Sequence, residues 1–558
     1  MASAGLLKLI SSGLQDERLL GPKGQPLISA FQKTFLRAGR FTTEWYRVDF
    51  DNQPAFGSTA KITVPRRGHL VTRAYLVTRM PDISTTQAQA RKYASDNGLQ
   101  FAGPTFGWTN SIGHALLTSA NITIGGAPID TLDGRLLEIL DEFHTPLEKT
   151  TTLNRLIGRY DNGFTPKSNG FTGVQEIVTP LPFWFSRGDP SSALPIDAIG
   201  NDLVQIGASY NVVDALYTST SRLKDPRSYV ITPGSPAVAS IPAQTLVKGC
   251  ERVFQSGDEA KAAIPEVTGM LAMPPMAGSP FYVLDPNGEE IFGLNGNPEK
   301  SVKVRRIPGI KMPESFKIQE SYILLEYVYL DKPEANRIRL ADLSYPVVQH
   351  YSFKQETKGH FTTRVPLRIP NPCRDIYFMA HRVDADLLNA PFLATRDLSG
   401  ANVFDISGIG LIAPWWPDAK GLSVDKFTSL VPAFSSIDSE PIQTLELLYE
   451  GKMIRYATSS PEFFRSILPT IEQRKTPWHN KYYYHLPFGT QSEEFGISNP
   501  MGQANLDKIT RIELSLTFKP FRGSLLESDV PAYTIYVWAE TYNMLRVYGG
   551  RGGVMFNY

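Results

Sequence analysis

Residues Thr59 to Arg79 read TAKITVPRRGHLVTRAYLVTR, and residues Thr362 to Arg382 read TTRVPLRIPNPCRDIYFMAHR. At an offset of 303 residues both stretches show a short alternating strand, a turn that contains proline or glycine, and a second apolar strand. The alignment places Tyr75 opposite Phe378. This agreement indicates that one part of the chain is a copy of another.

The repeat continues at nearly the same offset, where DLVQIGASY from Asp202 matches DKITRIELSL from Asp507. A period of roughly 300 residues is far longer than the repeat unit of a solenoid or propeller. The 558 residues are enough for two or three domains, each of which can bury its own core. The sequence therefore predicts two related domains.

The charge balance argues against a protein that binds nucleic acid. Lys plus Arg number 56 and Asp plus Glu number 55, which gives a net charge of +1. A nucleic-acid binder needs a surplus of positive charge to displace counterions from phosphates, so we expect no direct genome binding. One local basic group, Lys303, Arg305 and Arg306, is read as part of a solvated loop.

Cysteine usage and the absence of apolar runs bear on the compartment. Two cysteines, Cys250 and Cys373, are too few for a disulfide-stapled secreted domain, which favours a reducing compartment. The first residues show no signal-peptide pattern, and no uncharged apolar run approaches the length of a membrane span. Leucines and an isoleucine within residues 6–14 suit either a short helix docked on a neighbouring subunit or a frayed tail.

Strand signals dominate both halves of the chain, as alternating or β-branched runs punctuated by proline, glycine and asparagine. In the first half we expect strands at 30–41, 59–64, 70–80, 120–124, 176–185, 194–199, 202–213 and 321–330. In the second half we expect them at 347–353, 361–369, 375–382, 443–449, 482–486, 508–518 and 532–547. About eight short strands in each half, with long excursions between some of them, suit a jelly roll.

Helical signal is thin. Leucines recur at helical spacing within 131–142, where a helix would cap one end of a sandwich, and 332–343 is read as a short connector helix. The predicted fold class is all-β: two eight-stranded antiparallel jelly-roll sandwiches in tandem, with long loop insertions and a few short helices.

The expected organisation has four parts. Residues 1–25 form an N-terminal arm, 26–331 the first jelly roll with a large insertion at about 218–312, 332–343 a connector, and 344–558 the second jelly roll with a long loop at about 383–441. The aromatic and apolar content of both excursions indicates folded decoration. Alternate connections of a jelly roll emerge at the same end, so both excursions should project together.

No arrangement of residues points to catalysis. The sequence contains no HExxH, GxSxG or P-loop motif, and its eight histidines are scattered, so we assign no catalytic, cofactor-binding or metal-binding residue and expect no enzyme. His114 is read as satisfying a local hydrogen bond. Carboxylate pairs such as Glu289 with Glu290 and Glu493 with Glu494 are read as solvated, and GGRGG from Gly549 as a tail rather than a phosphate loop.

Five segments resemble the double jelly-roll major capsid proteins of nucleocytoplasmic large DNA viruses. The most specific is WTNSIGHALLTSANITIGG at 108–126. The others are GQPLISAFQKTFLRAGRF at 24–41, LPFWFSRGDPSSALPI at 181–196, SYILLEYVYLD at 321–331 and ETYNMLRVYGGRGGVMFNY at 540–558. The similarity is spread over nearly the whole chain outside the large excursions, and the chain is identified as a member of that family.

The resemblance implies a homotrimer that forms a pseudo-hexagonal capsomer and tiles an icosahedral shell. The implied partners are neighbouring capsomers, penton and minor capsid proteins and an internal membrane beneath the shell, with assembly in the host cytoplasm. Trp415, Trp416 and the tyrosines at 482–484 are candidates for the trimer interface or, equally, for ordinary core packing. The sequon at Asn121 falls in a predicted strand, so its glycosylation is doubtful.

Two other classes of function remain open from the residues alone. A jelly-roll lectin, or a host-attachment protein, would use aromatic side chains of exterior loops to bind a receptor or glycan. A carbohydrate-active enzyme on a β-sandwich would need two carboxylates that face each other across a groove, and the sequence offers no such pair to name.

Overall fold

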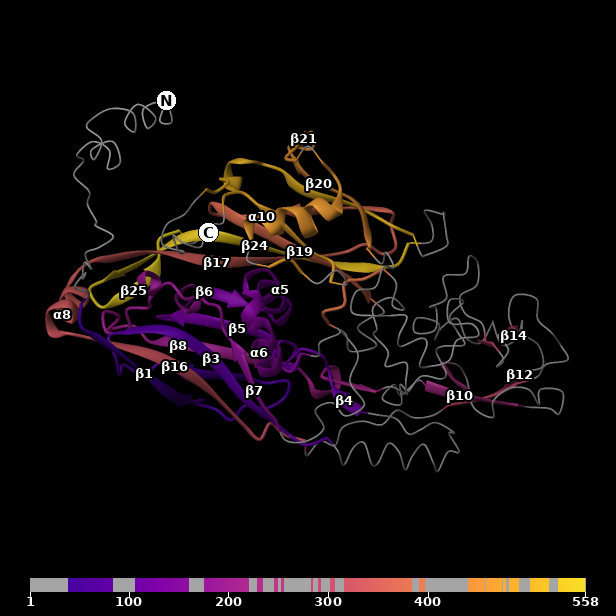
Figure 1. Ribbon diagram of the computed structural model, residues 1–558, viewed down its shortest axis with the longest axis horizontal. Coiled ribbons are helices and arrows are strands. Elements are labelled where there is room, and N and C mark those ends of the chain that lie inside the picture. Colours follow the sequence, from indigo (N-terminus) through magenta and orange to yellow (C-terminus); the bar gives the residue numbers. More distant parts are fainter. Residues whose placement is uncertain are drawn as a thin grey trace, which may run out of the picture.

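The computed structural model consists of two antiparallel β-sandwiches stacked on each other (Figure 1). It describes residues 39–83, 106–159, 175–219, 228–233, 245–248, 252–254, 283–284, 290–292, 302–306, 316–383, 391–396, 440–456, 458–473, 475–477, 481–490, 502–520 and 530–556. None of the helices in these ranges is long and apolar enough to cross a membrane.

The first sandwich has two sheets of four strands. One has the order β1-β16-β3-β7 and is built from Phe41–Asp49, Glu320–Leu330, Leu70–Met80 and Gln175–Pro180. The other has the order β2-β8-β5-β6 and is built from Thr59–Thr63, Val204–Tyr210, Leu117–Ile124 and Ala127–Leu132. Side chains alternate between core and solvent, as in β2, where Ala60 and Ile62 are buried while Thr59 and Lys61 are exposed.

The second sandwich repeats this plan. Its sheets have the orders β17-β24-β19-β22, from Leu343–Glu356, Tyr533–Tyr548, Cys373–Arg382 and Tyr483–Pro487, and β18-β23-β20-β21, from Thr362–Leu367, Ile512–Phe518, Ile442–Tyr449 and Met453–Ile454. A short strand, β25 (Arg551–Val554), also pairs with β24. Replacing each strand of the first sandwich by its counterpart reproduces both strand orders, which confirms the predicted duplication and the all-β double jelly roll.

The strands β3 and β19 share a β-bulge that fixes how the copies align. Thr72 is the extra residue between the pairs made by Val71 and Arg73, and Arg374 is the extra residue between those made by Cys373 and Asp375. Val71 and Cys373 both point into their cores.

The bulge corrects one part of the predicted alignment. Its position gives an offset of 302 in these strands, whereas 303 holds for β2 and β18. Tyr75 is therefore the counterpart of Tyr377. The predicted pairing of Tyr75 with Phe378 is wrong by one residue, because the connection before β19 is one residue shorter.

Most predicted strands are confirmed, and three are corrected. The strand at 176–185 ends at Pro180 and is followed by a 3-10 turn, since Pro180 and Pro182 lack the donor that would extend the ladder. At 194–199 only Leu194 forms an isolated bridge, before Pro195. The strand expected at 30–41 overlaps the described strand β1 only at Phe41; residues 30–38 lie outside the described ranges.

The helices lie in the connections. Within the described ranges the α-helices are α4 (Ile112–Ala115), α5 (Gly134–His144), α6 (Leu147–Ile157), α8 (Lys332–Leu340) and α10 (Leu468–Glu472), which directly follows a π-helix at Phe463–Ile467. The connector predicted at 332–343 is α8 followed by the start of β17. The helix predicted at 131–142 begins later, because Leu132 ends β6.

The large insertion contains strands of its own. The strands β10 (Ser228–Pro233), β11 (Thr245–Lys248), β12 (Arg252–Phe254) and β15 (Val302–Arg306) form one sheet, and β13 (Val283–Leu284) pairs with β14 (Glu290–Phe292). At the base of the insertion, β9 (Tyr217–Ser219) pairs with β4 (Phe106–Trp108) from an earlier connection. Folded structure is therefore confirmed for these strands. Lys303, Arg305 and Arg306 lie in β15 rather than in a loop. Figure 1 shows β10, β12 and β14 at the end of the molecule opposite α8.

The sheet β17-β24-β19-β22 is covered on both faces. One face packs into the core of the second sandwich, with Phe378 and Val537 among its members. The opposite face, with Tyr377 and Trp538, joins the core of the first sandwich. The two sandwiches therefore share a buried boundary, and α5 lies in it (Figure 1).

Candidate functional site at the junction of the two sandwiches

The helix α5 is the element that carries this junction. Its N-cap, Asp133, accepts a hydrogen bond from the backbone N–H of Leu136, and Leu136, Leu137, Leu140 and Phe143 bury its apolar side. The second carboxylate oxygen of Asp133 accepts a bond from the indole N–H of Trp538 at 2.6 Å. Burial raises the pKa of Asp133. The helix therefore does more than cap the first sandwich, because its cap also binds the second.

The start of α5 depends on a residue without a side chain. A Cβ atom on Gly134 would collide with the backbone carbonyl oxygen of His114 and lie 2.6 Å from that of Leu117. We predict that Gly134→Ala destabilises the protein by about 1–3 kcal/mol, because neither backbone can move aside cheaply. Chemical denaturation would measure the loss, and Gly200→Ala, where nothing lies within 4 Å, is the matched control. Equal stability of both variants would contradict the packing described.

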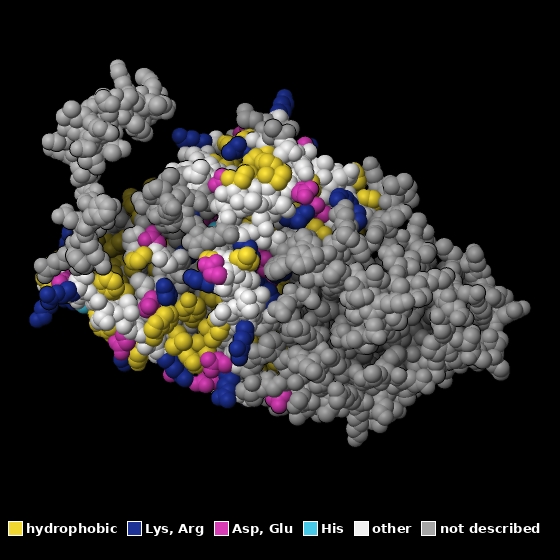
Figure 2. Space-filling view, in the orientation of Figure 1, with side chains coloured by type: hydrophobic (Ala, Val, Ile, Leu, Met, Phe, Trp, Pro, Cys, Tyr) yellow, Lys and Arg dark blue, Asp and Glu magenta, His cyan; other side chains and the backbone are white. Residues whose placement is uncertain are grey.

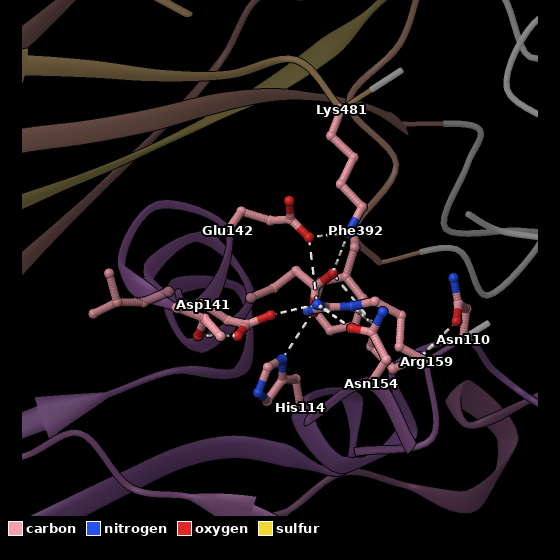
Figure 3. Close-up of polar contacts among 12 residues, drawn as sticks. Asn110, His114, Asp141, Glu142, Asn154, Arg159, Phe392 and Lys481 are labelled. Atoms are coloured by element: carbon pink, nitrogen blue, oxygen red, sulfur yellow. Dashed lines mark hydrogen bonds and ion pairs between the residues drawn. The ribbon is translucent and has the colours of Figure 1, made fainter. Parts of the chain in front are cut away.

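A cluster of charged residues is buried beside α5 (Figure 3). Arg159, which follows the left-handed C-cap Gly158 of α6, donates to Glu138 at 2.5 Å and to Asp141. From the second sandwich, the Nζ atom of Lys481 lies 3.0 Å from Glu138 and 2.6 Å from Glu142.

Further contacts complete the charged cluster. The Nζ atom of Lys475, also from the second sandwich, lies 3.6 Å from a Glu142 oxygen. His114 contributes its Nδ1 atom at 2.8 Å from Glu138.

The charges of this cluster balance. Three carboxylates, those of Glu138, Asp141 and Glu142, face three cations, those of Arg159, Lys475 and Lys481. Burial by itself would raise the pKa of Glu138, but the charges of Arg159 and Lys481 outweigh it and hold that pKa well below its usual range. Buried charges of this kind are stable only as a complete set, because removing one partner leaves another without compensation.

A second charged cluster lies on the same boundary. Arg187 donates to both carboxylate oxygens of Glu540, at 3.1 and 3.0 Å, and Arg374 donates to Glu540 at 3.2 Å. The two ring nitrogens of His350 lie 3.0 Å from Asp130 and 3.3 Å from Glu540. Burial opposes the charged form of His350, but the two carboxylates outweigh it and raise its pKa to about 9.

Aromatic side chains also pack across the junction. Phe143 of α5 lies 5.5 Å from Tyr377, whose ring stacks on that of His485 at 4.9 Å. Arg135 places its guanidinium over the ring of Tyr536 at 4.4 Å. The junction thus combines apolar packing with ion pairs of fixed geometry, which holds the sandwiches in one relative orientation.

A cleft of about 840 Å³ opens next to the junction. Its walls include Arg73 and Tyr75 of β3, the apolar side chains of α6, and the junction residues Arg187 and Arg374. The cleft therefore connects the outer face of the first sheet with the boundary between the sandwiches. No group of three metal-ligating side chains occurs within the described residues.

The residues singled out from the sequence fall into three groups. Tyr482, Tyr483 and Tyr484 are buried within the subunit, where Tyr483 bonds the carbonyl of Phe392 and Tyr484 bonds Glu440, so core packing is their role. His114 makes a hydrogen bond as expected, but its partner Glu138 stands 24 residues away, so the bond is not local. Asn121 lies in β5 as expected, and Cys373 is a buried thiol. Six of these residues lie outside the described part of the chain: Trp415, Trp416, Cys250, Glu289, Glu493 and Glu494. Glu290 lies in the strand β14, but its side chain is not described.

Sequence reasoning missed the charged clusters. A signal was present, since Glu138 and Glu142 stand four residues apart on a helix whose other residues are largely apolar. Two like charges at that spacing destabilise an isolated helix, which indicates that cations from elsewhere in the fold compensate them.

Two stacked jelly rolls of identical strand order, joined by a buried junction, define a double jelly-roll protein. Family models agree: a major capsid protein N-terminus model matches residues 29–239, and a large eukaryotic DNA virus major capsid protein model matches residues 342–553. The chain belongs to the major capsid proteins of large eukaryotic DNA viruses.

Individual relatives of the chain are also named as capsid proteins. The major capsid protein of Phaeocystis pouchetii virus is 25% identical over the full length of both chains. Capsid protein 1 of Acanthamoeba polyphaga mimivirus is 26% identical over 40% of this chain and 37% of its own, and probable capsid protein 4 of that virus is matched over 39% of its own length. These two relatives are thus matched over well under half of their length.

Solved structures show the same fold. The PBCV-1 VP54 structure superposes with a TM-score of 0.60 at 14% identity, over 95% of this chain and all of the other. The Faustovirus major capsid protein gives 0.54 at 12% identity, over 98% and 99%. Family and fold together place the protein in the virus capsid as a structural component.

Proposed function

We propose that the protein forms homotrimers that act as pseudo-hexagonal capsomers and tile the icosahedral shell of a large double-stranded DNA virus. The observation that carries this proposal is the identical strand order of the two sandwiches. Three copies of such a chain present six similar lobes, and closed symmetry is the usual outcome for a homo-oligomer. The junction supports it, because lobes must keep a fixed orientation to pack in a regular lattice.

The proposed division of labour follows the four predicted parts of the chain. Residues 26–331 and 344–558 are the lobes, 332–343 connects them, and 1–25 is an arm that would face the inside of the shell. The insertion at about 218–312 and the loop at about 383–441 would form exterior decoration, with room for a host receptor or glycan.

The proposed partners follow from the same role. They are neighbouring capsomers, penton and minor capsid proteins and an internal viral membrane, with assembly in the host cytoplasm. No catalytic role and no direct genome contact are part of the proposal.

We expect the purified chain to elute as a single species of three times the monomer mass, measured by size-exclusion chromatography with light scattering. Negative-stain images should show particles with threefold symmetry and a hexagonal outline. A chain that stays monomeric at micromolar concentration and above, or that forms dimers, would contradict this proposal.

A further inference from the structure

The boundary between the sandwiches is an interface of defined parts. The helix α5, which lies between β6 and β7, packs on the outer face of the sheet β17-β24-β19-β22. Phe143 contacts Tyr377, and Asp133 binds Trp538. A helical connection of the first sandwich therefore covers the outer sheet face of the second sandwich.

The first sandwich has the same face on its sheet β1-β16-β3-β7. The shared bulge makes Tyr75 the counterpart of Tyr377. Tyr75 pairs with Leu324 on β16, as Tyr377 pairs with Trp538 on β24, so Leu324 corresponds to Trp538. By the same argument Trp45, which pairs with Glu326, corresponds to His350, which pairs with Glu540.

This face is partly exposed, and its aromatic and apolar side chains lie among ion pairs that join Arg47 to Glu320 and Arg73 to Glu326. The side chain of Trp45 is 45% exposed and lies 5.7 Å from the ring of Tyr75, while Leu324 and Tyr322 are half-buried beside them. Figure 2 shows hydrophobic side chains gathered over the region of β3 and β16, rimmed by charged groups. A contiguous apolar surface on a folded chain marks an interaction site.

The second sandwich has an exposed counterpart of α5. The connection between β21 and β22 contains the π-helix Phe463–Ile467 and α10, in the same position as α5 between β6 and β7. Ile467 and Ile471 are 49% and 72% exposed, and their spacing of four residues puts them on one side of the helix. The covering element therefore has an apolar side that is largely exposed.

The two surfaces lie on opposite sides of the molecule. Figure 1 shows α10 at the top of the stack, β1, β16 and β3 at the bottom, and the junction between them. They cannot meet within one chain. A second copy of the chain, placed as the second sandwich is placed on the first, brings the α10 surface of one subunit onto the β1-β16-β3-β7 face of the next.

We propose that the contact between subunits repeats the internal junction: the helical segment 463–472 of one copy, through Ile467 and Ile471, covers the outer face around Trp45, Tyr75 and Leu324 of its neighbour. This inference rests on the proposed trimer and names its contact surfaces. The contact is head-to-tail, so it forms a ring if the rotation closes.

The position of the internal junction supports the proposed contact, because the exposed face adjoins that junction. The cleft beside α6 is lined both by Tyr75 and by the junction residues Arg187 and Arg374. The exposed face thus begins where the internal junction ends. A second copy seated on it would extend one continuous buried layer around the ring.

Charge substitutions in the full-length chain test the surfaces. We expect Trp45→Glu and Ile471→Glu each to weaken the trimer, seen as a rise of at least about tenfold in the concentration at which half the chain is trimeric. Circular dichroism should show both variants folded. Leu340→Glu, which changes an exposed leucine on α8 outside both surfaces, is the matched control and should leave the trimer intact.

Cross-linking tests the pairing itself and does not depend on loss of assembly. With Cys250 replaced by serine, Trp45→Cys and Ile471→Cys are placed in one chain and treated with a short bismaleimide. We expect covalent dimers and trimers from the double variant, and none from either single variant.

The failures are distinguishable. If the unmodified chain forms no trimer, the proposed function fails. If it forms trimers that neither substitution weakens, if the double variant yields no covalent dimers or trimers, or if Trp45→Cys alone yields covalent dimers, the trimer stands and the proposed contact is overturned.

Discussion

Replacing Lys481 by methionine should lower the free energy of unfolding by about 3–5 kcal/mol, the cost of breaking a buried ion pair from one side. Lys481 comes from the second sandwich and bridges Glu138 and Glu142 of the first. Methionine has a similar volume and restores none of the positive charge, so two buried carboxylates lose a cation. Midpoints of chemical denaturation, followed by tryptophan fluorescence, would measure the loss.

A matched control separates this effect from the loss of any lysine. Lys452 is exposed in the turn between β20 and β21, and Lys452→Met should change stability by less than about 0.5 kcal/mol. Adding Glu142→Gln to Lys481→Met should recover part of the loss, because the uncompensated charge is removed with its partner. If the single and double variants are equally unstable, the charge is not the cause.

The strand pattern of the sequence predicted the duplication but not its exact register. In β2 only one face is buried, so alternation fixes which residues point inward. Nearly every residue of β19 is buried, because the sheet is covered on both faces. Alternation therefore disappears in β19, and the one-residue difference before it could not be seen.

The charged junction was hidden for a different reason. Glu138, Arg159 and Lys481 are distant in the sequence, and charged residues are solvated by default. Only the packing of α5 between the sandwiches brings them together away from water. The two acids of α5, four residues apart, were the local signal, whereas their partners on other elements depend on the tertiary fold.

The junction also makes stability depend on pH, through His350. Its ring faces Asp130 from β6 and Glu540 from β24, while Arg187 lies 2.9 Å from Nε2. A neutral ring would accept a bond from Arg187. The protonated ring is favoured because it gives three cations, His350, Arg187 and Arg374, for three carboxylates, Asp130, Asp375 and Glu540.

The direction of this pH dependence follows from the pKa of His350, which folding raises from the ordinary 6.5 to about 9. The proton bound by His350 stabilises the fold fully below pH 6.5, and that contribution is lost as the pH rises through 9. Its size is about 3 kcal/mol, from the difference between these two pKa values. His144 affects stability in another pH range. Burial lowers its pKa to about 3, so its protonation destabilises the fold only as the pH falls below 6.5.

We therefore expect the free energy of unfolding to fall by about 3 kcal/mol between pH 6.5 and 9.5, and His350→Gln to remove most of that dependence while being less stable at pH 6.5. Denaturant midpoints at four or five pH values for both proteins would measure it. His360→Gln, which changes a histidine in the turn before β18, is the control and should keep the full slope. Parallel curves for the unmodified chain and His350→Gln would show that the ring is neutral in the fold and that Arg187, not a proton, satisfies Nε2.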